Sequence, residues 1–419
     1  MKHTETDIII AGAGPSGIAA ASGAASESVC GKILILEKTN APGKKLSITG
    51  KGRCNITNTA SRKEFIQAFG KNGKFLYNCF SVFFREELLD LLGEAGVETA
   101  AERGGRVFPS NCGAPELTGQ LLKFINKKGA VIKTGAPVKE IIKRGNQITG
   151  VRTENSEYSC SRLILATGGR SYPGTGSTGD GYTLARAAGH SVTKIFPSLT
   201  GLLSEAPFCR ELQGLSLRNS ALKLFSSGKA IFEEFGEMLF THYGISGPAV
   251  LTLSRESVPL LKNGEKCEIS IDLKPALSHD QLDNRLRREF ESGGSKKYKN
   301  ILKTLLPSGM IPVFINLTEI PEDTEGCRIN SKQRTRLRKL LKDFRIPLSG
   351  YRGWHEAIVT RGGVNIKEIN PKTMESKILN GLYICGELLD IDAVTGGYNL
   401  QAAFSTGWSA GKAAAEALL

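Results

Sequence analysis

The sequence predicts an α/β fold in which a discontinuous Rossmann-like domain, built from both ends of the chain, encloses an inserted β-barrel-like domain and a small helical insert. Three observations predict it. A glycine-rich turn links a buried strand to a helix near the N-terminus, and further buried strands stand at 163–167 and 381–385. The middle of the chain changes to short alternating runs and then to helical patterns. The expected domains are 1–194, 195–275 (with 346–356 returning to it), 276–345 and 357–419.

Composition sets the broad class. The 419 residues are 40% hydrophobic and 23% charged, which is typical of a folded protein of two or three domains. The net charge of +14 attracts polyanions or phosphorylated ligands. Nine cysteines without a CxxC pair argue against a zinc site and a disulfide framework, and fit reduced thiols in a cytoplasmic protein. The sequence contains no stretch of about 18 apolar residues, so no membrane-spanning helix is predicted.

The first motif has the full context of a dinucleotide-binding turn. Residues 7–11 read DIIIA, as in a buried parallel strand, and GAGPSG follows at 12–17. A helix of small residues comes next, then a second buried strand at 33–36 that ends in Glu37. Strand, GxGxxG, helix, strand and acid in this order predict a nucleotide site.

Each residue of this motif has a physical role. Gly12 allows the tight turn, Gly14 lets a pyrophosphate approach the backbone, and Gly17 lets the helix lie close to the strand. The helix N-terminus offers free N–H groups to the phosphates. Glu37 can accept hydrogen bonds from ribose hydroxyls and would repel a 2′-phosphate, which disfavours NADP here.

The segment after Glu37 indicates a long cofactor. Residues 44–58 read KKLSITGKGRCNITN, a cationic and glycine-rich stretch suited to wrapping a cofactor with two phosphates. A solvated surface loop is the alternative. Within it, Cys54 is expected to be a small packed residue, because no partner cysteine is near in sequence.

Glycines that allow a ligand to approach the backbone also follow the other predicted strands. The strand at 163–167 ends in Thr167 and Gly168, which permits close approach of a ligand to the backbone. The strand at 381–385 runs into Gly386 and Glu387. Paired glycines ending at Gly397 leave the amides of the last helix open to a ring that carries negative charge when reduced. Nucleotide-binding elements at both chain ends are typical of flavoproteins rather than simple dehydrogenases.

These motifs resemble a known family. GAGPSG, KKLSITGKGRCNITN, ATGGRSYPGTGSTGDGY, FTHYGISGPAVL, VTRGGV and ICGELLDIDAVTGGYNLQAAFSTG are similar to segments of the BaiN-type, or aminoacetone-oxidase-type, FAD-binding flavoproteins along nearly the whole chain. The resemblance implies FAD on the first motif. It implies that the ADP half is held by Pro15, Ser16, Glu37 and Lys38, the pyrophosphate or flavin side by Lys45, Arg53 and Asn55, the adenine by the Val138 backbone, the ribitol by Glu387, and the isoalloxazine by Asn399 and Leu400.

A second GxGxxG lies at 174–179. The strand before it ends six residues too early, and no strand ending in an acid follows about twenty residues later. We therefore interpret it as a glycine loop before a helix at 180–189 that lines the flavin cavity. A separate nicotinamide domain is not expected.

The helical insert is strongly basic. Residues 275–345 hold fifteen Lys and Arg against nine Asp and Glu, a net +6, and KQRTRLRKLLK at 332–342 is the densest part. Two interpretations stay open: a solvated helix face, and a contact surface for an RNA phosphate backbone.

For chemistry, the proton-donor candidates are Tyr172, His242 and Tyr398, each of which also has a structural interpretation. The first hypothesis is reduction of a carbon–carbon double bond conjugated to a carbonyl. Reduced FAD gives hydride to the β-carbon, a side chain protonates the α-carbon, and NAD(P)H supplies the electrons. By resemblance the substrate is a 3-oxo-Δ4 steroid or bile-acid enone, or uracil in ribosomal RNA, and the basic charge favours RNA. The alternatives are a flavin oxidase of a small amine such as aminoacetone, and an RNA- or ribosome-binding module with structural FAD.

Overall fold

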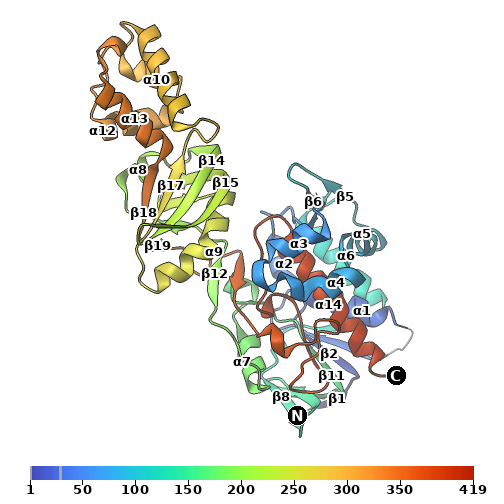
Figure 1. Cartoon of the computed structure of the whole chain (residues 1–419). Coiled ribbons are helices and arrows are strands. Elements are labelled where there is room, and N and C mark those ends of the chain that lie inside the picture. Colours follow the sequence, from blue (N-terminus) through green and yellow to red (C-terminus); the bar gives the residue numbers. More distant parts are fainter. Residues whose placement is uncertain (1, 28–30) are drawn as a thin grey trace. The chain divides into compact units, whose positions relative to one another are not determined.

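The computed structural model describes residues 2–27 and 31–419 and folds into two compact units (Figure 1). Unit 1 comprises the chain up to Pro197 together with Ala357–Leu419, and unit 2 comprises Ser198–Glu356. Each has its own hydrophobic core. In unit 2 the strands and the helices share one core, while the expected division into 195–275 and 276–345 stays a prediction.

A five-stranded parallel sheet forms the centre of unit 1. Its order is β21 (Leu382–Ile384), β11 (Arg162–Leu165), β2 (Ile8–Ala11), β3 (Ile33–Leu36) and β7 (Val131–Lys133). The runs IIIA, ILIL and LYI are buried along their whole length, as parallel strands covered on both faces must be. In register, Ile8 pairs with Ile33 and with Arg162.

The strand order places a switch point between β2 and β11. From β2 the chain adds β3 and then β7 on one side, and it later adds β11 and then β21 on the other. Ligands of open α/β sheets bind outside the carboxyl ends of the strands at such a point. The turn after β2 and the glycines after β11, predicted separately as cofactor elements, are therefore neighbours.

Helices α1 (Pro15–Ala25) and α14 (Tyr398–Glu416) lie side by side in Figure 1, although their residues are almost 400 positions apart. Their backbones nearly touch. A Cβ at Gly411 would stand 1.9 Å from the Ala20 carbonyl oxygen, and one at Gly407 would stand 2.1 Å from that of Ser16. The small residues of both helices are what permit this approach, and they seat the N-terminus of α1 at the sheet.

Unit 1 also contains two small sheets and further helices. The small sheets have the orders β1-β10-β9-β8 and β4-β6-β5, and β12 and β20 form a separate two-stranded sheet. The strands are β1 (Lys2–Glu5), β4 (Thr57–Asn58), β5 (Thr99–Ala101), β6 (Arg106–Pro109), β8 (Glu140–Arg144), β9 (Gln147–Arg152), β10 (Ser156–Ser159) and β20 (Val359–Arg361), with β12 (Phe196–Ser198) at the boundary. The helices are α2 (Lys44–Ile48), α3 (Arg62–Ala68), α4 (Tyr77–Val82), α5 (Arg85–Glu94), α6 (Ala114–Lys127) and α7 (Asp180–Ala187).

Unit 2 contains a seven-stranded sheet where a β-barrel-like insert is expected. All its pairings are antiparallel, and β18 and β19 are its end strands. Its order is β18 (Phe344–Leu348), β17 (Cys267–Asp272), β14 (Ser216–Ser226), β15 (Lys229–Thr241), β16 (Gly244–Ser246), β13 (Leu202–Leu203) and β19 (Gly350–Tyr351).

The short alternating runs in the middle of the chain, at 197–274, predict strands, and this prediction is wrong for one long segment. Residues Pro248–Lys262 form helix α9, which packs on β15 and β14. Its buried residues Val250, Leu253 and Val258 have helical spacing, so tertiary burial overrides the β-branched and proline content of the segment. The remaining helices are α8 (Pro207–Glu211), α10 (His279–Gly293), α11 (Tyr298–Leu302), α12 (Ile311–Thr318) and α13 (Ser331–Lys342), and the last four occupy the stretch expected to be helical.

The cysteines of the described chain are free thiols, and Cys30 lies outside the described residues. Burial raises the pKa of the Cys54 thiol to about 12, so this residue is packed and not ionised. Within residues 2–27 and 31–419, no cluster of His, Cys, Asp or Glu is arranged to hold a metal ion. None of the helices in the same ranges is both long and apolar enough to cross a membrane.

A buried histidine gives unit 1 a pH-dependent stability. His190 Nδ1 lies 3.1 Å from Glu368 Oε2, and Nε2 lies 2.8 Å from Ser376 Oγ. Burial lowers the pKa of His190 below its ordinary 6.5, although Glu368 acts in the opposite direction. The folded protein therefore binds fewer protons than the unfolded chain just below pH 6.5, and stability present above that pH is lost as the pH falls towards the folded-state value.

We expect the free energy of unfolding, measured with urea, to fall between pH 7.5 and 5.5 in the wild type and to fall less in His190→Gln. Equal slopes in the two proteins would contradict this assignment.

Candidate functional site

The turn after β2 has the geometry of a phosphate cradle. Gly12 has φ +107°, and a Cβ there would meet the Ala166 carbonyl oxygen at 2.6 Å. A Cβ at Gly17 would meet the Gly12 oxygen at 1.9 Å. At Gly14 the added Cβ would meet nothing within 4 Å, so the backbone borders open space at the position where a pyrophosphate is expected. Pro15 occupies the first turn of α1, and no side chain caps that helix at Gly14, so its first N–H groups face the same position.

Glu37 and Lys38, at the carboxyl end of β3, are held by the protein. Glu37 accepts hydrogen bonds from the Ala13 amide at 2.9 Å and from the Thr39 amide at 2.7 Å. Lys38 Nζ pairs with Asp180 Oδ2 at 2.6 Å. Burial acts to raise the pKa of Asp180, but hydrogen bonds from Lys38 and Thr178 lower it overall. The carboxylate of Glu37 thus braces the turn, and its predicted contact with ribose stays a prediction.

The second glycine-rich segment closes against the same strand end. A Cβ at Gly176 would meet Thr39 Cγ2 at 2.8 Å, and Gly176 itself has φ +105°. Helix α7 begins at Asp180 and is preceded by Gly179. The segment at 174–179 is therefore a loop of the first nucleotide frame.

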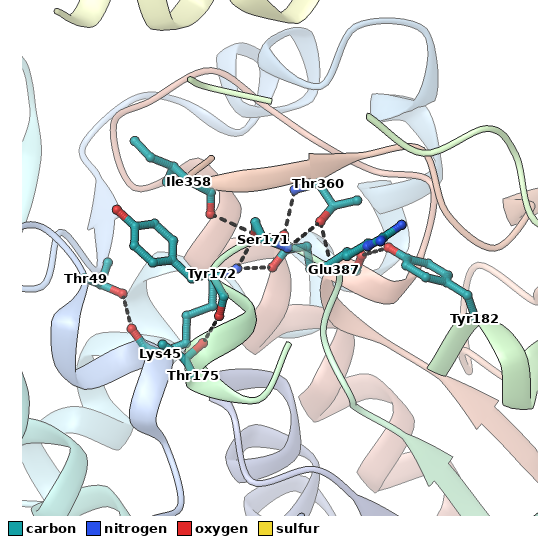
Figure 2. A network of polar contacts seen from close by, with 10 residues as sticks. Lys45, Thr49, Ser171, Tyr172, Thr175, Tyr182, Ile358, Thr360 and Glu387 are labelled. Carbon is teal, nitrogen blue, oxygen red and sulfur yellow. Dashed lines mark hydrogen bonds and ion pairs between the residues drawn. The ribbon is translucent and has the colours of Figure 1, made fainter. Parts of the chain in front are cut away.

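Four polar side chains from distant parts of unit 1 meet in one network (Figure 2). Lys45, on α2, donates to Ser171 Oγ and pairs with Glu387 Oε2, both at 2.7 Å. Glu387 Oε1 accepts from Ser171 Oγ at 2.9 Å and from the Thr360 amide at 2.7 Å. The Thr360 hydroxyl oxygen accepts from the Ser171 amide at 3.2 Å. Two predicted cofactor residues, Lys45 and Glu387, are thus brought together beside the carboxyl ends of β11 and β21.

Tyr172 follows directly on this network. It has φ +54° and ψ +61°, a left-handed conformation that is uncommon for a non-glycine residue. Its carbonyl oxygen accepts from the Thr175 amide at 2.9 Å and from the Thr175 hydroxyl at 2.7 Å, which holds the turn. Non-glycine residues held in sparsely populated conformations cluster at functional sites.

Three residues that are predicted to contact the cofactor bind other parts of the protein: Asn55, Asn399 and Arg53. The Asn55 amide accepts from the Gly397 N–H and donates to the Thr57 oxygen, at 3.1 Å each. Asn399 fastens the loop before α14 by accepting from the Ala393 amide at 2.9 Å and donating to its carbonyl at 3.1 Å. The Arg53 guanidinium pairs with Glu102 and lies 4.3 Å from the centre of the Phe108 ring. Their predicted cofactor contacts stay predictions.

The start of α14 is closely packed. A Cβ at Gly397 would stand 2.3 Å from the Thr57 oxygen, and a Cβ at Gly386 would stand 2.6 Å from Ser16 Oγ. Tyr398 packs its ring edge against Phe65, with centroids 4.6 Å apart, and burial raises the pKa of its hydroxyl. Leu400 is partly buried against the core of unit 1.

Two residues that are predicted to contact the cofactor have polar groups without a hydrogen-bond partner in the described chain. The hydroxyl of Thr167 is buried without a hydrogen-bond partner in the described chain, next to Gly168, which has φ +72°. The backbone N–H and C=O of Val138 also form no hydrogen bond with another described residue. The Val138 backbone groups are available to a ligand, whereas the Thr167 hydroxyl oxygen would lie 1.9 Å from a Cβ at Gly181 of α7.

His242 belongs to unit 2. It is exposed in the turn between β15 and β16, where its ring contacts Tyr243 edge-on with centroids 5.0 Å apart. The other two proton-donor candidates are in unit 1 with the nucleotide frame.

The sequence interpretation missed Ser171 and Thr360. Both lie in motifs already singled out by their glycines, ATGGRSYPG and VTRGGV. Hydroxyl residues beside glycines at the ends of strands are the signal that points to them. Their partners are not visible in the sequence, because Glu387 is 216 positions from Ser171.

The sequence model described as HI0933-like protein Rossmann domain matches residues 6–413. The chain belongs to the HI0933-like family of FAD-binding Rossmann proteins. The chain is 32% identical over 409 residues to a 3-dehydro-bile acid delta(4,6)-reductase of Clostridium scindens, covering 97% of this chain and 98% of that one. It is 29% identical over 405 residues to a ribosomal RNA dihydrouridine synthase of Escherichia coli, covering 96% of each.

A solved structure of a flavocytochrome c3 fumarate reductase has the same fold, with a TM-score of 0.53 at 16% identity over 99% of this chain and 79% of that one. The HI0933-like chain fits an FAD on its own geometry. Open space stands over Gly14, and the first turn of α1 lacks a side-chain cap. Both lie at the switch point of the parallel sheet, where the pyrophosphate of a dinucleotide belongs.

Proposed function

We propose that this protein is an FAD-dependent reductase of a carbon–carbon double bond conjugated to a carbonyl, with NAD(P)H as the electron donor. Its substrate is then a 3-oxo-Δ4 steroid enone or a uracil ring of RNA. The observation that carries the proposal is that two curated relatives, each aligned over nearly its whole length, have names that denote one kind of chemistry. A delta(4,6)-reductase and a dihydrouridine synthase both add two hydrogens across an activated C=C bond.

Bound FAD supplies a hydride acceptor for NAD(P)H and a hydride donor for the β-carbon of the substrate. The α1 amides at Gly14 and the backbone beyond β11 would hold it. Lys45 and Glu387, fixed to each other and to Ser171, set the position of the loop after β11. Positioning of this kind is the main contribution of the protein to cofactor chemistry.

Tyr172 is the proton donor that we propose for the α-carbon. It lies in the loop after β11, and Thr175 holds its backbone in a left-handed conformation, which fixes the direction of its Cα–Cβ bond. Tyr398, in contrast, packs the edge of its ring against Phe65. Balance requires one hydride to the β-carbon and one proton to the α-carbon, and a tyrosine hydroxyl resupplied from solvent gives the proton.

The test is anaerobic stopped-flow reduction of the purified holoprotein by NADH and by NADPH, followed by mixing with a 3-oxo-Δ4 bile acid or with unmodified ribosomal RNA. Rapid reoxidation by one of them, with the saturated product formed in equal amount, supports the proposal and names the substrate. If neither reoxidises the flavin while oxygen does so quickly with release of peroxide, the proposal fails and an oxidase of a small amine replaces it.

A further inference from the structure

A groove of about 870 Å³ lies in unit 2 beside helix α13. Residues of β14, β17 and β18 supply its floor, and one side of α13 supplies its wall. The lining contains five basic side chains: Lys223, Arg336, Lys339, Lys342 and Arg345. Two aspartates, Asp272 and Asp343, are its carboxylates. The groove is therefore a cationic feature of unit 2 that the proposed reductase chemistry in unit 1 does not use.

Exposed apolar side chains continue the floor of the groove onto β15. Ala221, which lines the groove, stands directly opposite Phe235 in the antiparallel pair, and Lys223 stands opposite Glu233. Opposed residues of an antiparallel pair point to the same face, and the Lys223–Glu233 ion pair of 3.2 Å agrees with this register. Phe235 is 60% exposed, so a large aromatic ring is presented to solvent at the edge of the groove.

Guanidinium and aromatic groups also combine on the floor itself. The Arg345 guanidinium lies 3.9 Å from the centre of the Phe225 ring, in a stacked position. Phe225 and Phe235 both stand on the face that carries Lys223, since they occupy alternate or opposed positions of β14 and β15. The face therefore offers flat, polarisable surfaces between cations, which is how proteins bind unstacked bases.

Two cations of the groove remain open to a polyanion. Lys342 pairs with Asp272 at 2.6 Å, Arg345 pairs with Asp343 and with Glu268, and Lys223 pairs with Glu233. Lys339 is exposed and has no ion-pair partner in the part of the chain that the structure describes. Arg336 pairs with Glu319 at 2.6 Å, with both side chains about half-exposed or more. Surface pairs of that kind contribute little, so a phosphate can take the place of the carboxylate.

We propose that this groove binds a single-stranded segment of RNA, with phosphates on Arg336 and Lys339 of α13 and a base stacked on Phe235. The inference rests on the proposed function, because it selects RNA as the substrate class of that reductase. Phosphates repeated along a strand match two neighbouring cations of one helix, and bases match the exposed ring. A steroid acid brings one carboxylate and needs an apolar cavity, which this lining does not offer.

The test is binding of a fluorescein-labelled ten-nucleotide uridine RNA to the full-length holoprotein, followed by anisotropy between 50 and 200 mM salt. Phe235→Ala is expected to weaken binding about tenfold at every salt concentration, because one stacked base is lost. Lys339→Glu is expected to weaken it about tenfold at 100 mM salt and to reduce the salt dependence, because phosphate contacts are lost. Both positions are exposed, so both variants should fold.

The matched controls are Lys332→Glu, which removes the same charge from an exposed site on α13 that does not line the groove, and Tyr77→Ala, which removes a ring that is 58% exposed in unit 1. Both controls are expected to bind within twofold of the wild type. The inference is overturned if Phe235→Ala and Lys339→Glu also bind within twofold. It is equally overturned if Lys332→Glu loses as much as Lys339→Glu, or if the protein binds phosphatidylserine vesicles in the groove and not the RNA.

Turnover of a small free enone tests the proposed reductase activity independently of RNA binding to the groove. The groove variants are expected to keep the wild-type kcat with that substrate. If groove-dependent RNA binding is found but no conjugated double bond is reduced, the reductase proposal fails and the RNA site stands. If the enone is reduced and RNA binding ignores the groove, the reductase stands and the RNA site fails.

Discussion

Gly14→Val is expected to lose FAD while keeping its fold. The Cβ of residue 14 would enter open space, and the backbone there, at φ −79° and ψ −175°, is one that valine adopts without strain. The added methyl groups would occupy the position of the pyrophosphate and keep it from the α1 amides. Loss of two charge-assisted hydrogen bonds predicts an FAD affinity lower by at least about 100-fold. Flavin absorbance of the purified variant and titration of its apoprotein with FAD measure this.

Two glycine variants control that result. At Gly353, in unit 2, an added Cβ also meets nothing within 4 Å, so Gly353→Val should keep a full complement of flavin. Gly17→Ala should instead unfold the nucleotide frame, because its Cβ would collide with the Gly12 oxygen. The free energy of unfolding of apo Gly14→Val should fall by no more than about 1 kcal/mol, the cost of a poorer N-cap. A Gly14→Val protein that retains FAD would show that the pyrophosphate binds elsewhere.

Tyr172→Phe is expected to lower kcat for enone reduction by about 100-fold or more, the usual contribution of a positioned general acid. The phenylalanine keeps the ring and the backbone turn held by Thr175 but removes the proton. Reduction of the bound flavin by NAD(P)H should proceed at the wild-type rate, because that half of the reaction needs no proton at the α-carbon. Separate stopped-flow measurements of the reductive and oxidative half-reactions distinguish the two steps.

Tyr398→Phe is the matched control for this substitution. It keeps the edge-on contact with Phe65, and we expect its kcat to stay within about threefold of the wild type. A large loss in Tyr398→Phe together with a normal Tyr172→Phe would assign the proton to the start of α14. A slow reductive half-reaction in Tyr172→Phe would show that the residue positions the cofactor and does not donate the proton.

Most basic side chains of α13 are paired with carboxylates of the same unit. The run at 332–342 predicts a helix with an apolar face and a basic face, and Leu337 and Leu341 are buried as the spacing requires. Its basic face is interpreted either as a solvated helix face or as a contact surface for an RNA phosphate backbone. In the structure Arg334 and Arg338 share Asp283 of α10, and Lys342 pairs with Asp272 of β17. The free basic surface of α13 is therefore smaller than the sequence implies, with Lys339 as its cation at the groove that has no ion-pair partner among the described residues.

By itself, the sequence determined the parts of the nucleotide frame: the apolar strands, the GxGxxG turn, the acid after the second strand and the final helix. Each is written in a window of about thirty residues or fewer, because buried strands, tight turns and helices follow from local periodicity and from glycine. Tertiary structure alone decided which of these parts meet. The order of the parallel strands joins the turn at 12–17 to the glycines after β11, and it sets Lys45 against Glu387, 342 positions away. Such pairs depend on strand order and packing across the whole chain, and helix α9 formed where burial on a sheet outweighed local preference.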